Sequence, residues 1–191
     1  MKRRVLNEKL AQADTAGVWG FTLPSFSVLM GGLDPAYVKL MMKRLSDQAV
    51  LIRAARGVYV NPHARSLPAD TRRGLLRFLR PREISYVSLE SKLSEAGVIS
   101  QIATALTCMT TGSPGRFETP WGAVEFTHTD RKIEFGTDVL VQDDGTLEAT
   151  IRTAVRDLRR VGRNLHLIDE ESLADAISEQ ESLDEQQSGR A

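Results

Sequence analysis

The sequence predicts an α+β protein, in which a helical N-terminal region that ends in a β-hairpin precedes a mixed α/β region. Three observations lead to this prediction. Apolar residues recur in several segments with the roughly 3.6-residue period of a helix. Two pairs of β-rich runs flank glycine-containing turns, as in hairpins. The chain of 191 residues also changes the sign of its charge near its middle, which favours two parts with different roles.

The first two helices are expected before residue 31. A short amphipathic helix is predicted over Arg3–Ala13. The residues on its apolar face are Leu6, Leu10 and Ala13. Gly17 follows this helix, and residues 18–21 read as a short extended piece. Thr22 can then cap a second, short helix, whose first turn tolerates Pro24 because the amide there needs no partner.

The third helix has the strongest start signal in the sequence. Gly31 and Gly32 stop the second helix, and Asp34 follows as an N-cap with Pro35 at the first helical position. We therefore expect a helix over Pro35–Asp47. One stripe with i, i+3, i+4 and i+7 spacing should face the core, and it consists of Val38, Met41, Met42 and Leu45.

A β-hairpin is expected directly after the third helix. The β-rich runs 50–54 and 58–60 are joined by Ala55-Arg56-Gly57, where Gly57 can take the positive φ of a tight turn. The order helix, short strand, helix, glycine turn, helix and hairpin is that of a winged helix-turn-helix. We expect this fold over residues 1–62, with the hairpin as its wing.

The rest of the chain is predicted as a mixed α/β domain after a basic linker. The linker, residues 63–82, contains a helix over Thr71–Leu79 that Asp70 can cap. The C-terminal domain is expected over residues 83–178. It would contain a helix over 86–96, a strand over 102–111, a hairpin over 117–127, a strand over 139–141, a helix from Ile151 and a last helix near 170–178. The acidic tail, residues 179–191, is expected to be disordered.

The composition argues against a transmembrane or secreted protein. No apolar run approaches the roughly 20 residues of a membrane-spanning helix. The start Met-Lys-Arg-Arg is followed by mixed polar sequence, not by a signal-peptide pattern, so we expect a cytoplasmic protein. The single cysteine, Cys108, excludes an intrachain disulfide, and three scattered histidines give no zinc-ligand spacing. No metal or cofactor is expected.

The formal net charge of zero hides an asymmetry between the halves. Residues 1–82 hold 15 Lys+Arg and 5 Asp+Glu, whereas residues 83–191 hold 10 Lys+Arg and 20 Asp+Glu. A basic half favours a polyanionic partner, because each phosphate that is neutralised releases condensed counterions. The alternative is that two solvated surfaces simply differ in sign.

The third predicted helix offers a face that suits the major groove of DNA. If the apolar stripe faces the core, Lys39, Leu40 and Lys43 lie on the far side and Arg44 on a flank. An arginine on the wing can enter a minor groove. We therefore expect the DNA-binding residues to be Lys39, Lys43 and Arg44 on the helix and Arg53 and Arg56 on the wing. Each lysine taken alone is better explained as a solubilising surface residue, so the expectation rests on the whole set together with the basic charge of this half.

The sequence gives no support to an enzyme. His128 lies near Glu125 and Asp130, but a lone histidine at a hairpin end is usually a surface residue. Cys108 is most simply a buried small hydrophobic residue. No Ser/His/Asp arrangement, glycine-rich phosphate loop or paired-carboxylate motif is visible, so no catalytic residue is expected.

Two groups of motifs resemble the AbiEi family, the antitoxins of abortive-infection (type IV) toxin–antitoxin systems. Residues 18–60, which end in the run Leu51-Ile52-Arg53-Ala54-Ala55-Arg56-Gly57-Val58-Tyr59, resemble the N-terminal domain of that family. The run Tyr86-Val87-Ser88-Leu89-Glu90-Ser91 and the run Phe117-Glu118-Thr119-Pro120-Trp121-Gly122 resemble its C-terminal antitoxin domain. The resemblance spans about residues 15–175, but residues 127–137 and the acidic tail match no family pattern.

This resemblance implies a protein with two roles. The winged helix would bind inverted repeats in the promoter of its own operon and repress it, through the five basic residues named above. The C-terminal domain would counteract a cognate nucleotidyltransferase-like toxin, with or without direct contact. Two alternatives stay open. The acidic half could bind a basic partner as an interaction module, or residues 83–178 could sense a small molecule in a one-component transcriptional regulator.

Overall fold

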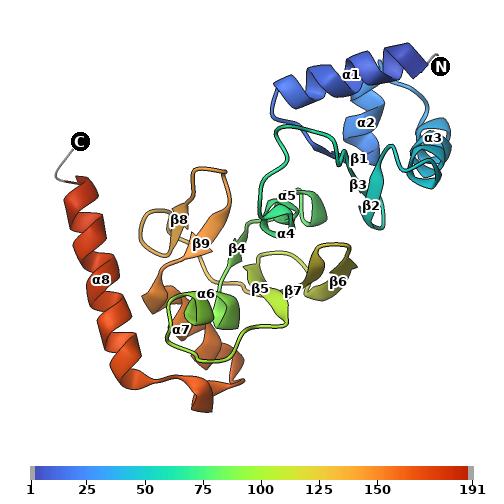
Figure 1. Cartoon of the computed structure of the whole chain (residues 1–191). Helices are drawn as coiled ribbons and strands as arrows, with labels where there is room; N and C mark the ends of the chain where they lie inside the picture. Colours follow the sequence, from blue (N-terminus) through green and yellow to red (C-terminus); the bar gives the residue numbers. More distant parts are fainter. Residues whose placement is uncertain (1–2, 189–191) are drawn as a thin grey trace. The chain divides into compact units, whose positions relative to one another are not determined.

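The computed structural model describes residues 3–188, and within them the chain is an α+β protein with two β-sheets (Figure 1). The chain divides into two compact units. The first comprises Met1–Pro81 and Glu118–Trp121, and the second comprises Arg82–Phe117 and Gly122–Ala191. Among the described residues, none of the helices combines the length and the apolar character that crossing a bilayer requires.

The helices of the first unit begin and end close to the predicted residues. They are α1 (Arg3–Thr15), α2 (Leu23–Leu29) and α3 (Pro35–Asp47). Thr22 caps α2 in a capping box, in which its hydroxyl accepts the Ser25 amide and the Ser25 hydroxyl accepts the Thr22 amide. Asp34 caps α3, because its carboxylate accepts the amides of Ala36 and Tyr37 at 2.9 and 3.1 Å. The start signals of these two helices are confirmed.

The core of the first unit contains the predicted apolar faces of α1 and α3. Leu6, Leu10 and Ala13 of α1 are buried, and so is the whole predicted stripe of α3, Val38, Met41, Met42 and Leu45. The rings of Phe21 and Phe26 meet edge to face in the same cluster, with centroids 5.5 Å apart. Burying one face of α3 leaves its other face exposed.

A three-stranded antiparallel sheet completes the first unit. Its strands, β1 (Gly20–Thr22), β2 (Ile52–Ala55) and β3 (Val58–Val60), lie in the order β1-β3-β2. β2 and β3 form the predicted hairpin, in which Gly57 has a φ of 79°. The register shifts between Arg53 and Ala55, so β2 contains a bulge before the turn.

The segment after this sheet differs from the single helix predicted over Thr71–Leu79. It forms two short helices, α4 (Thr71–Gly74) and α5 (Leu76–Leu79), which break at the buried Leu75. The predicted cap is confirmed, since Asp70 accepts the Arg73 amide at 3.0 Å. A Cβ on Gly74 would lie 2.7 Å from the Trp19 ring, so this segment packs closely against Trp19.

A mixed six-stranded sheet, which belongs to the second unit except for the last two residues of β6, has the order β6-β7-β5-β4-β9-β8. β5 pairs in parallel with β7 and antiparallel with β4, while β9 pairs in parallel with β4 and antiparallel with β8. The strands are β4 (Ser85–Val87), β5 (Ala105–Thr110), β6 (Gly115–Thr119), β7 (Gly122–His128), β8 (Val139–Val141) and β9 (Leu147–Ala149). The predicted second hairpin and the strand at 139–141 are confirmed, and β9 was not predicted.

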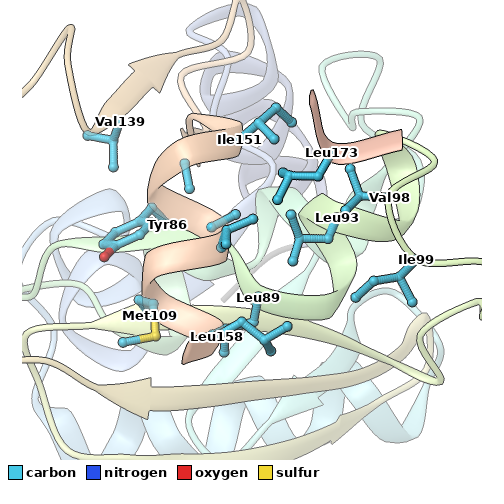
Figure 2. Close-up of a cluster of buried hydrophobic side chains, with 13 residues drawn as sticks. Tyr86, Leu89, Leu93, Val98, Ile99, Met109, Val139, Ile151, Leu158 and Leu173 are labelled. Carbon is cyan, nitrogen blue, oxygen red and sulfur yellow. The ribbon is translucent and has the colours of Figure 1, made fainter. Parts of the chain in front are cut away.

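Helices pack against this sheet through one apolar cluster, which Figure 2 shows in close-up. α6 (Leu89–Glu95), α7 (Ile151–Val161) and α8 (Glu170–Ser188) contribute to it, and the 3-10 turn η1 (Leu165–Leu167) links α7 to α8. The predicted stripe of α7 is confirmed, because its members Ile151, Ala154, Val155 and Leu158 are all buried.

The structure corrects two predictions in this unit. The helix expected over 86–96 begins only at Leu89, because Tyr86 and Val87 belong to the central strand β4 and are buried there. The acidic tail expected to be disordered is helical as far as Ser188, while residues 189–191 lie outside the described residues. Polar contacts between α8 and α7 include the Gln180 side chain, which accepts the Ile151 amide at 2.8 Å, and the pair of Glu181 with Arg152 at 2.6 Å.

Candidate nucleic-acid interface

The exposed face of α3 carries the basic residues that the sequence analysis singled out. Lys39, Lys43 and Arg44 are exposed, and Leu40 between them is 46% exposed. Their direction follows from the buried stripe of the same helix, since residues about half a turn away must point outward. The cap at Asp34 fixes where the helix starts and therefore where these side chains lie along it.

The β2–β3 hairpin supplies the other two predicted residues. Arg53 lies on β2 opposite Tyr59, and its Nε donates to the carbonyl oxygen of Ala55 at 3.4 Å. Arg56 lies in the turn beside Gly57 and is exposed. Both guanidinium groups are therefore carried by a short, tightly turned element.

A groove of about 630 Å³ brings four of the five predicted residues together. α3 forms one wall with Lys39 and Lys43, and the hairpin forms the other with Arg53 and Arg56. Leu40 and Tyr59 add apolar surface to the lining. A concave surface with cations on both walls suits an extended polyanion better than a compact ligand.

The charges in this groove are largely uncompensated. Within residues 3–188, none of its four cations lies within 4 Å of a carboxylate oxygen, and Arg53 contacts only a backbone carbonyl. Asp47, at the end of α3, is the acidic residue of the lining. Cations without a protein partner can exchange counterions for phosphates without first breaking an ion pair.

Arg44 lies apart from the other four predicted residues. It lines a second groove, of about 230 Å³, on the opposite flank of α3, where α1 forms the facing wall. Among the polar residues that share this groove, the helical period already places Tyr37 on the flank of Arg44, whereas sequence analysis missed Arg3 and Asn7 of α1 and Gln48. The i, i+7, i+11 spacing of Tyr37, Arg44 and Gln48 was the available signal, but the position of α1 depends on tertiary packing.

The second unit contains a charged pocket of about 260 Å³. Arg163 donates to both carboxylate oxygens of Glu90 at 2.8 and 3.0 Å and also hydrogen-bonds Glu125. Asn164 donates to Glu90 at 2.9 Å. Burial alone would raise the pKa of Glu90, but the hydrogen bonds from Arg163 and Asn164 outweigh it and lower the pKa. These groups satisfy one another, which favours a structural ion network over acid–base chemistry.

The remaining candidates of the sequence analysis are engaged in local contacts. The Nδ1 of His128 lies 2.7 Å from the Gly112 carbonyl oxygen, and its Nε2 lies 2.7 Å from a carboxylate oxygen of Asp130. The Gly112 contact and the Asp130 carboxylate raise the pKa of His128. Cys108 is buried in β5, as predicted. In the part of the chain that the structure describes, no three His, Cys, Asp or Glu side chains could hold a metal ion together.

Among known proteins, no family model, no curated protein and no solved structure matches this chain.

Proposed function

We propose that the first unit is a winged helix-turn-helix that binds double-stranded DNA. In this interpretation α2 and α3 are the helix-turn-helix, and the β2–β3 hairpin is the wing. The element order of residues 3–60 supports the proposal, as does the antiparallel sheet in the order β1-β3-β2. The turn between the two helices contains Gly31 and Gly32, both with positive φ, which suits a sharp reversal.

The observation that carries this proposal is the groove between α3 and the hairpin. Four cations that are far apart in the sequence, from Lys39 to Arg56, line one concave surface and pair with no carboxylate in residues 3–188. An α-helix fits the major groove of B-DNA, and an arginine on the wing fits the adjacent minor groove. The arrangement therefore matches both grooves of a duplex at once.

The chemistry of α3 gives each residue a role in this complex. Lys39 and Lys43 donate hydrogen bonds to guanine edges or to phosphates, and Leu40 meets a thymine methyl group. Arg53 and Arg56 reach the minor groove, where a narrow groove concentrates negative potential. Asp47 lines the same groove as these cations, so its carboxylate must stay clear of the phosphates in the complex.

For the whole chain we propose an antitoxin that represses its own operon. The resemblance to the AbiEi family motivates this role, in which the DNA partner is an operator with inverted repeats. The second unit would counteract a cognate nucleotidyltransferase-like toxin in the cytoplasm, without any enzymatic step of its own. The acidic composition of residues 83–191 is compatible with a basic partner.

Fluorescence anisotropy of the full chain tests the DNA-binding proposal. The probe is the duplex upstream of the protein's own gene, with a scrambled duplex as control, over a salt series. We expect the parent to prefer the upstream duplex, and the variant Lys39→Ala/Lys43→Ala to lose that preference. Lys9→Ala is the matched control, because Lys9 of α1 lines neither groove. Equal binding of both duplexes by the parent would overturn sequence-specific repression.

Co-expression with the neighbouring gene product tests the antitoxin proposal. We expect the chain to restore the growth of cells that produce the toxin. Stable co-purification would assign neutralisation to direct contact, whereas rescue without a complex would assign it to an indirect route. Unchanged toxicity would overturn the antitoxin role and leave DNA binding standing.

The pocket around Glu90 and Arg163 favours one further candidate, a one-component regulator with a sensor in the second unit. Its volume of about 260 Å³ suits only a small polar ligand. Thermal unfolding with a set of small polar metabolites tests this candidate. A ligand that raises Tm and changes DNA affinity would support it, and the absence of any such ligand would remove it.

A further inference from the structure

α3 lies between two grooves, and its exposed face contributes residues to both. Leu40 lines the groove toward the hairpin and also the second groove toward α1. Lys39 and Lys43 flank it on the hairpin side, and Tyr37 and Arg44 flank it on the α1 side. α1, α2 and α3 are the blue segments of Figure 1. The helix that we propose for DNA recognition therefore has a groove with basic side chains along each flank.

The second groove is basic, and its lining within residues 3–188 contains no acidic residue. Arg3 and Arg44 are its cations, and both are exposed. Neither of them lies within 4 Å of a carboxylate oxygen in the part of the chain that the structure describes. Tyr37, Asn7 and Gln48 add a hydroxyl and two amide groups, which are hydrogen-bond donors. Two free cations with neutral donors between them match the chemistry of a phosphodiester backbone.

The dimensions of a helix in a major groove place a phosphate backbone on each flank. An α-helix with its side chains is about 10–12 Å wide, and the major groove is about 12 Å wide. The two strands that border the groove therefore run along opposite sides of the docked helix. If the hairpin side of α3 faces one strand, the α1 side must face the other.

We propose that the groove between α1 and α3 binds the phosphate backbone of the DNA strand opposite to the one that the hairpin contacts. Arg3 and Arg44 supply the charge, and Tyr37 donates its hydroxyl hydrogen to a phosphate oxygen. This inference rests on the proposed function. Phosphate contacts carry no sequence information, but they fix how deeply and in which register a recognition helix sits. α1 thereby becomes part of the interface.

Salt-dependent anisotropy of the full chain tests this assignment. Arg3→Ala and Arg44→Ala should each weaken binding to the upstream and the scrambled duplex by the same factor. Each should also make the slope of log affinity against log salt shallower by about one unit. The fall in affinity between 50 and 200 mM salt should then be roughly fourfold smaller for the variant than for the parent. Arg4→Ala is the matched control, because Arg4 neighbours Arg3 on α1 but lines neither groove and pairs with Glu8 at 3.5 Å.

Ethylation interference identifies the strand that each groove contacts. For the parent, we expect ethylation of phosphates on either strand of the upstream duplex to interfere with binding. In the Arg44→Ala variant we expect one strand to lose an interfering phosphate, and in the Lys43→Ala variant, which alters the groove toward the hairpin, the other strand. Loss on the same strand in both variants would overturn the opposite-strand assignment.

Two further outcomes separate this inference from the proposed function. If Lys39→Ala/Lys43→Ala abolishes specific binding while Arg3→Ala and Arg44→Ala bind like Arg4→Ala, the second groove is not a phosphate site and the proposed function stands. If the parent binds no DNA, both fail. Sedimentation of the DNA-free protein completes the test, since a dimer that Arg44→Ala dissociates would assign the groove to a second copy of the chain and overturn the inference.

Discussion

The carboxylate of Asp138 in the second unit is held by three close hydrogen-bond donors. It accepts hydrogen bonds from Arg156 at 2.6 Å, from Arg131 at 2.9 Å and from the Glu134 amide at 3.0 Å. Burial would raise its pKa, but these three donors outweigh burial and hold the pKa at about 2. The side chain therefore remains charged in the native state at pH values where an ordinary aspartate is protonated.

We expect Asp138→Asn to destabilise the protein in a pH-dependent way. The lowered pKa means that the native carboxylate contributes its full stabilisation above the unfolded value of 3.8 and loses it as the pH falls toward 2. A pKa shift of this size corresponds to a contribution of about 2 kcal/mol to the free energy of unfolding at low salt. Urea unfolding of parent and variant at several pH values measures the difference, which should be largest near neutrality and should shrink between pH 4 and 2.

Asp130→Asn is the matched control for this prediction. Asp130 also accepts one hydrogen bond, from the ring of His128, but its side chain is 93% exposed. Exposed ion pairs contribute little, typically less than about 1 kcal/mol. Equal losses in the two variants at pH 7 would contradict the role assigned to the Asp138 cluster.

At the scale of elements, the N-cap of α3 links the fold to the proposed interface. Asp34 accepts two backbone amides of the first turn, which would otherwise have no intrahelical partner. Asp34→Ala should therefore lower the free energy of unfolding by about 1 kcal/mol, as for other N-caps. Urea denaturation measures this loss, and Asp34→Ser should restore most of it because serine is also a good N-cap. A serine variant as unstable as the alanine variant would show that Asp34 acts by another route.

The packing of α5 on β1 depends on a missing side chain. A Cβ on Gly20 would lie 2.6 and 2.7 Å from two ring atoms of Phe78, closer than packed carbon atoms approach. We expect Gly20→Ala to destabilise the protein by about 1–3 kcal/mol, the usual cost of overpacking. Thermal unfolding measures the loss. The double variant Gly20→Ala/Phe78→Leu should lose less than the sum of the single variants, and strict additivity would contradict the clash.

Elements with local signals could be predicted from the sequence, and elements that depend on contacts with distant segments could not. α2, α3 and α7 carry a cap residue and an apolar period within a few residues of one another, so local sequence was sufficient. β9 places the charged residue Glu148 inside a sheet, where sequence patterns disfavour a strand, and the distant Lys92 pairs with it at 2.7 Å. The extension of α8 likewise depends on α7, through Arg152 and the Ile151 amide.

The same distinction holds for the candidate interface. Helical period and turn chemistry placed Lys39 and Lys43 on one face and Arg53 and Arg56 on a hairpin, and the structure brings these four together. The separation of Arg44 from them follows from where α1 packs. That packing joins residues more than thirty positions apart, so no local pattern encodes it.

At the scale of the whole molecule, net charge and DNA affinity need not follow one another. The chain is formally neutral, yet residues 1–82 carry ten more basic than acidic residues. Counterion release depends on the phosphates that are contacted and not on the total charge of the protein. We therefore expect the affinity of the neutral full chain for its upstream duplex to fall steeply with salt. An affinity that anisotropy finds independent of salt would contradict a phosphate-binding surface in the first unit.

The division into two units predicts that repression and toxin neutralisation can be separated by mutation. Lys39 and Lys43 belong to the first unit and are fully on its surface, so replacing both by alanine removes charge without disturbing the core. We expect this variant to lose repression of a reporter behind its own promoter while it still restores growth in the presence of the toxin. Lys9→Ala should retain both properties, and immunoblotting checks that all variants reach the same level. Loss of both properties at equal protein level would mean that one surface of the first unit serves both partners.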